Sequence, residues 1–232
     1  MLVLGPGYPV RALDGAHFTE AIRTEVTTRV ATSESHRQIS RDARFAVTLQ
    51  GDTLTVSADS LILTELSDGR SRTLDTDGFV GGRYLFQLDS LGRAALLERP
   101  FVPDDLIEVS DVGRAMDDFF PSLPPAMIVG AEATDASARH WRRLTDSSGV
   151  QRFRWTVEQE HNGTEAVADS VTAAVSGSSH EVSALAWSPT RGPLHWSRRI
   201  ESDITTRLRG QTIRATVIQR IAVKREWMRE ER

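Results

Sequence analysis

Apolar and polar residues alternate along most of the chain with the two-residue period of half-buried strands. The first such stretch has an apolar parity of Phe18, Ile22, Val26 and Val30 and a polar parity of Arg23, Glu25, Thr27 and Arg29. Successive side chains of a strand point to opposite faces, so this pattern predicts one buried and one solvated face.

The same alternation recurs to the end of the chain. Strands are predicted over residues 39–49, 54–66, 84–88, 94–97, 153–157, 167–175, 182–187, 194–208 and 213–223. Gly51-Asp52 and Asn162-Gly163 are typical hairpin turns, and Ser176 to Ser179 is predicted to be a loop. The fold class is therefore mainly β: an antiparallel meander that forms a curved sheet or barrel-like halves.

One segment breaks the alternation with helical spacing. Its apolar positions are Leu106, Val109, Val112, Met116, Phe119 and Phe120. Asp104 and Asp105 stand where acids favour a helix start, and prolines follow from Pro121. We expect one amphipathic helix near residues 103–120.

These elements give a domain organisation. Residues 1–16 are rich in glycine and proline and are predicted to be an irregular arm, and residues 225–232 are a charged tail. Between them, residues 17–224 are expected to form a single β-rich domain, with 17–100 and 126–224 as its possible halves joined by the helix.

Composition narrows the chemistry. The chain has 232 residues and no cysteine, which excludes disulfides and thiolate catalysis. Its formal net charge of −4 provides no overall attraction for nucleic acid. No apolar stretch reaches the length of a transmembrane helix. No two of the six histidines are two, three or four residues apart, and neither a nucleophile elbow nor a phosphate-binding glycine loop is present. We therefore expect a protein that is not an enzyme and carries no cofactor or metal.

The middle of the chain resembles a family of uncharacterised bacterial envelope proteins, many of them lipoproteins. The passages that carry the resemblance are Arg83 to Gly92 and Phe120 to Gly130, which flank the expected helix. The resemblance implies two β-rich halves and an extracytoplasmic, membrane-peripheral location in the periplasm. This chain lacks the lipobox cysteine, so lipid anchoring is not implied.

Three features are candidate contact sites for a partner. The arm offers Leu2, Leu4 and Tyr8, and the helix start offers Asp104 and Asp105. The last strands are basic and offer Arg207, Arg209, Arg214 and Arg220. Such arginines suit an acidic protein face or an anionic lipid surface, while long side chains on an outer sheet face also cover apolar surface.

The leading functional hypothesis is a non-enzymatic accessory or scaffold subunit of a larger membrane-associated envelope complex, such as a respiratory or photosynthetic assembly. The alternative is a periplasmic carrier or binding domain for a lipid or other apolar ligand held within the curved sheet. An enzyme of an unrecognised type is the third hypothesis.

Overall fold

The fold consists mainly of β-strands in the residues that the structure describes. The structure is a computed structural model that describes residues 13–67, 69–88, 94–100, 126–168, 171–208 and 210–227. Its strands are β1 (Ala16–Val30), β2 (Ser33–Gln50), β3 (Thr53–Ser67), β4 (Arg70–Leu74), β5 (Arg83–Leu88), β6 (Ala94–Glu98), β7 (Glu132–Thr134), β8 (His140–Ser147), β9 (Val150–Ala168), β10 (Val171–Ser188), β11 (Gly192–Leu208) and β12 (Gln211–Trp227).

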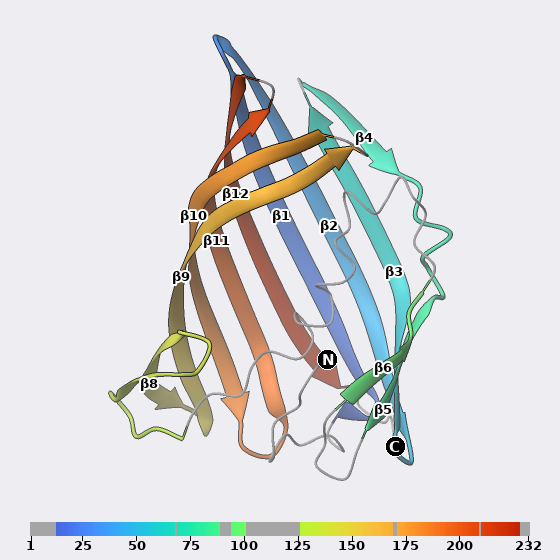
Figure 1. Cartoon of the computed structure of the whole chain (residues 1–232). Helices are drawn as coiled ribbons and strands as arrows, with labels where there is room; N and C mark the ends of the chain where they lie inside the picture. Colours follow the sequence, from blue (N-terminus) through green and yellow to red (C-terminus); the bar gives the residue numbers. More distant parts are fainter. Residues whose placement is uncertain are drawn as a thin grey trace.

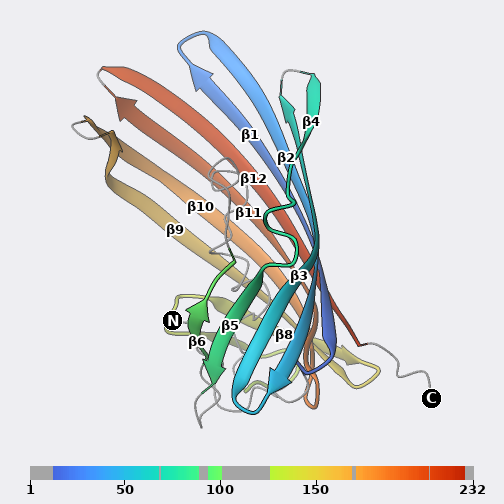
Figure 2. The same cartoon turned by 90° about the vertical axis from the view of Figure 1, so that its right-hand side faces the viewer.

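All twelve strands belong to one antiparallel sheet in the order β6-β5-β3-β2-β1-β12-β11-β10-β9-β8-β7, with β4 beside β3. The first and last long strands, β1 and β12, pair along their whole lengths in the middle of the sheet. Figures 1 and 2 show a single open layer whose β9 and β10 curl over the face seen in Figure 1. The mainly β prediction is therefore confirmed, with the chain's two halves hydrogen-bonded into one sheet.

The sheet has an inner face, towards which it curls, and an outer face. Phe18, Phe45, Trp196, Val223 and Leu185 share the inner face through their cross-strand registers and belong to one buried cluster. The Phe18 and Trp196 rings meet edge to face with centroids 6.1 Å apart. The cluster occupies the end of the sheet where β1 begins and β12 ends, and we call this end the core end.

The opposite end of the long strands, the far end, is more polar. From Thr24 to Val30 the inner side chains of β1 are half-buried threonines and valines, facing Gln219, Val217, Ala215 and Ile213 of β12. The strands keep their alternation here, although none of these side chains belongs to the buried cluster.

Two turn predictions are wrong in the same region. Asn162-Gly163 lies inside β9, and the predicted loop at Ser176 to Ser179 lies inside β10, where Ser176 pairs with Asn162. Gly177 allows the neighbouring strand to come close, because a Cβ there would lie 2.1 Å from the carbonyl oxygen of Asp203. Small polar residues therefore continue the ladder between two paired strands instead of ending it. By contrast, Gly51 forms the predicted β2–β3 turn with a φ of 63°.

The helix expected at 103–120 lies outside the described residues, none of which is in an α-helix. Within the same described part of the chain, no helix is long and apolar enough to cross a membrane.

Candidate functional site

Charged side chains lie on both faces of the sheet, and on the inner face buried glutamates are paired with arginines. Glu20 and Arg41 face each other across β1 and β2, with the Arg41 Nε donating to Glu20 Oε1 at 2.6 Å. Their side chains are 0% and 7% exposed. Nearby, Glu65 accepts from both Arg37 and Arg72. Burial tends to raise the pKa of the Glu65 carboxyl, but the two arginines hold the pKa below its ordinary value.

A second inner network centres on Glu181 of β10. Its carboxylate accepts from Trp155 Nε1 at 3.0 Å, from Ser183 Oγ at 2.7 Å and from Arg198 at 2.9 Å. Burial favours the neutral acid, yet Arg198 and these hydrogen bonds outweigh it and lower the pKa of Glu181. Arg198, which interrupts an apolar parity in the sequence, is therefore an ion-pair partner on the inner face.

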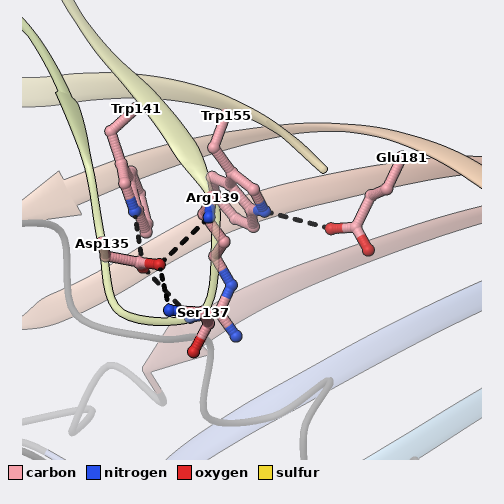
Figure 3. A network of polar contacts seen from close by, with 6 residues as sticks. All are labelled: Asp135, Ser137, Arg139, Trp141, Trp155 and Glu181. Carbon is pink, nitrogen blue, oxygen red and sulfur yellow. Dashed lines mark hydrogen bonds and ion pairs between the residues drawn. The ribbon is translucent and has the colours of Figure 1, made fainter. Parts of the chain in front are cut away.

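Figure 3 shows a similar network, in which the Asp135 carboxylate anchors Trp141, the tryptophan next to Trp155. Asp135 accepts from Trp141 Nε1 at 2.8 Å and from the backbone N–H groups of Ser137 and Arg139. Burial again tends to raise the pKa of the carboxyl, and the hydrogen bonds, led by that of Trp141, lower it. The Trp141 and Trp155 rings lie 4.6 Å apart between the two carboxylates. Each indole N–H is thus satisfied, as buried indoles require.

These inner networks satisfy buried polar groups and hold strands together. The Ser183 hydroxyl that donates to Glu181 is buried, and no group of three potential metal ligands occurs among the described residues. We therefore assign the inner charges to the stability of the fold.

One zone of the outer face carries more cations than acids, and the row beside it, towards the far end, holds Glu25, Glu201 and Glu158. Three consecutive cross-strand rows, which run from β2 to β8, contain eight basic side chains and one acid, Asp42. The upper row holds Arg23, Arg220 and Arg199, the middle row holds Arg154 and Arg142, and the lower row holds Arg44, Lys224 and Arg152. On a chain with a net charge of −4, this concentration, which we call the basic band, is a local reversal of sign.

A groove of about 930 Å³ crosses the basic band. Its floor is formed where four neighbouring strands place small side chains side by side: Ala21, Ala222, Ser197 and Ala184. The upper-row arginines and Arg154 rise around this floor. A second hollow of about 590 Å³ over β7 to β9 shares Arg154 with the groove and contains Arg142.

The upper-row arginines are paired with exposed carboxylates. Arg23 contacts both Asp42 oxygens, at 3.0 and 2.9 Å, and Arg220 contacts Glu25 at 2.7 Å. Arg199 pairs with Glu201 along its own strand. These pairs are about half exposed, so each is weak and exchangeable.

The structure places the sequence-predicted contact residues differently. Arg220 lies in the groove, while Arg207 and Arg214 lie on the same face nearer the far end. Leu2, Leu4, Tyr8, Asp104, Asp105 and Arg209 lie outside the described residues.

Sequence reasoning missed most of the basic band. Arg23, Arg154 and Arg199 come from β1, β9 and β11, and only β11 adjoins β12 through a short hairpin. Their polar parity was visible in the sequence, but the β1–β12 pairing that unites them spans almost the whole chain.

Comparison with known proteins gives no family. No family profile matches the chain, and no curated protein is similar to it in sequence. Pseudomonas aeruginosa OpdQ overlaps with 91% of this chain and 99% of its own at 6% identity and a TM-score of 0.31. A β-barrel-like protein of unknown function from Brucella abortus overlaps with 93% of this chain and 99% of its own, at 11% identity and a TM-score of 0.15. MucB in complex with MucA overlaps over 92% and 91% at 9% identity and a TM-score of 0.11. These likenesses assign no function to the chain.

Proposed function

We propose that this chain is a non-enzymatic accessory subunit that docks through the basic groove onto an acidic partner in a membrane-associated complex of the bacterial envelope. The observation that carries the proposal is the basic band itself, in which three neighbouring rows of the outer face hold eight cations and one acid. Exposed ion pairs contribute little to stability, so a partner explains this concentration of cations better than folding does.

The proposed location is the periplasmic side of the envelope, with the membrane reached through the partner. An association surface of this kind gains rate and specificity from complementary charge, and it tolerates an open shallow shape. The proposal needs no catalytic residue.

The test is co-purification from the source organism followed by native mass spectrometry. The variant Arg199→Gln/Arg220→Gln removes two groove cations, and Arg207→Gln/Arg214→Gln removes two from the same strands and face outside the groove. We expect the first variant to lose its partners and the second to retain them. Equal recovery of partners by both variants, or no partner for the wild-type chain, would refute the proposal.

The far end of the inner face supports a second candidate, a carrier for a lipid or another apolar ligand. Half-buried Val26, Val30, Val217 and Ile213 continue the apolar alternation beyond the buried cluster. A sheet with an apolar face is stable when something covers that face.

The carrier is tested by extracting purified protein with organic solvent and identifying released lipid by mass spectrometry. A carrier would release lipid in a fixed ratio, and Val217→Arg would abolish it. Protein that releases no lipid above a mock purification eliminates this candidate.

A further inference from the structure

We propose that the occupant of the basic groove is an extended acidic peptide segment of the partner, lying across the strands on the small-residue floor. This inference rests on the proposed accessory function and specifies the chemistry of its docking site. Three properties of the groove favour this occupant: its length, its charge and its depth.

The length of the site suits a peptide better than a single anion. The groove and the adjoining hollow extend from Ala21 on β1 to Glu132 on β7. These are six strand-to-strand steps in the sheet order, or about 29 Å at about 4.8 Å a step. An extended peptide covers that distance with about nine residues.

The charges on the rim are mainly cationic and suit carboxylates, although Glu201 and Glu132 also line it. Guanidinium groups form paired hydrogen bonds with carboxylates, and five of the eight cations of the basic band are arginines in the upper and middle rows. Arg154 lies at the junction of the two hollows, and no described carboxylate lies within ion-pair distance of it. The arginines above the floor exchange exposed intramolecular carboxylates for those of the peptide, so binding does not require breaking a buried pair.

The depth of the site favours a peptide over a membrane surface. The methyl groups of Ala21, Ala222 and Ala184 lie at the level of the sheet, below the long side chains of the neighbouring rows. A lipid bilayer would touch the tips of those side chains and leave the floor empty. A single extended chain fits between the rows and covers the floor.

Two probes distinguish these partners. The first is a fluorescein-labelled nonapeptide of alternating glutamate and alanine, with the glutamine analogue as its control. The second is a vesicle of phosphatidylcholine with 30% phosphatidylglycerol. Binding of each to the full chain is measured by anisotropy or co-sedimentation at low and at physiological salt.

Two variants on the outer face distinguish the contribution of the groove floor to binding from that of the charges. Ser197→Trp fills the floor without removing a cation, and Ser178→Trp places the same side chain on the same face of β10 outside the groove. Ser178 is exposed and does not line the groove. Far-UV circular dichroism confirms that each variant is folded before binding is measured.

The proposal predicts that the glutamate peptide binds at least tenfold more tightly than the glutamine peptide, with weaker binding at higher salt. Ser197→Trp should weaken peptide binding at least tenfold, and Ser178→Trp should leave it within twofold. Vesicle binding that survives Ser197→Trp, without specific peptide binding, overturns the proposal in favour of a lipid surface. If neither probe binds while groove-dependent co-purification persists, the acidic peptide is wrong but the accessory function stands.

Discussion

The two faces of the central strands use arginine in opposite ways. On the inner face Arg41 is buried and Arg198 is partly buried, and each is paired with a glutamate from a neighbouring strand. On the outer face Arg199 and Arg220 are exposed, and each is paired with an exposed glutamate of the adjoining row. The residue type is the same, but a buried ion pair is costly to break, whereas an exposed ion pair contributes little to stability.

The core end supplies hydrophobic burial and buried ion pairs, and the outer face of the same strands carries exposed charges. The proposed function assigns folding to the first and binding to the second. The following predictions test that division, from the largest expected effect on stability to the smallest.

Trp196→Ala should have the largest effect. The indole is fully buried and packs edge to face against Phe18, so its loss should lower the free energy of unfolding by about 3–5 kcal/mol. Urea denaturation followed by circular dichroism measures the change. A loss below about 1 kcal/mol would mean that the inner face does not form the core.

The second prediction compares one glutamate from each face of β1. Glu20→Gln leaves Arg41 buried without its counter-charge and should cost about 3–5 kcal/mol. Glu25→Gln breaks the exposed pair with Arg220 and should cost less than about 1 kcal/mol. Both losses in the free energy of unfolding are measured by the same denaturation. Similar losses for the two variants would show that the ion pairs of the two faces do not differ in their contribution to stability.

The third prediction concerns pH. The lowered pKa of the Glu181 carboxyl stabilises the fold fully above the ordinary glutamate value of 4.5. That contribution is lost as the pH falls through the lower pKa of the folded state. The free energy of unfolding should therefore decrease below about pH 5, and Glu181→Gln should make the decrease shallower. An unchanged slope in the variant would show that Glu181 does not contribute.

Much of the fold was predictable from the sequence because the alternation of side chains survives in every long strand. The β11–β12 hairpin, the Gly51 turn and the polar parity of β1 follow directly from local pattern. The interior of β9 and β10 was not predictable in this way, because Asn162, Gly163 and Gly177 favour turns in isolation and are held extended by paired neighbours.

The candidate site was less accessible from sequence. Arg220 was identified because β12 is visibly basic, whereas Arg23 and Arg154 reach the same groove only through pairing between β1 and β12 and from β10 to β9. Pairing across almost the whole chain has no local signal. The small residues of the groove floor also give no recognisable sequence signal, since alanine and serine occur on any strand face.

The most direct measurement of the central claim is the free energy of unfolding of Arg199→Gln/Arg220→Gln beside its recovery of partners. The account predicts that stability stays within about 2 kcal/mol of the wild-type value, since two exposed pairs are lost, while partner recovery falls to background. A variant that keeps its partners, or that loses them only because it unfolds, would contradict the assignment of the outer face to binding.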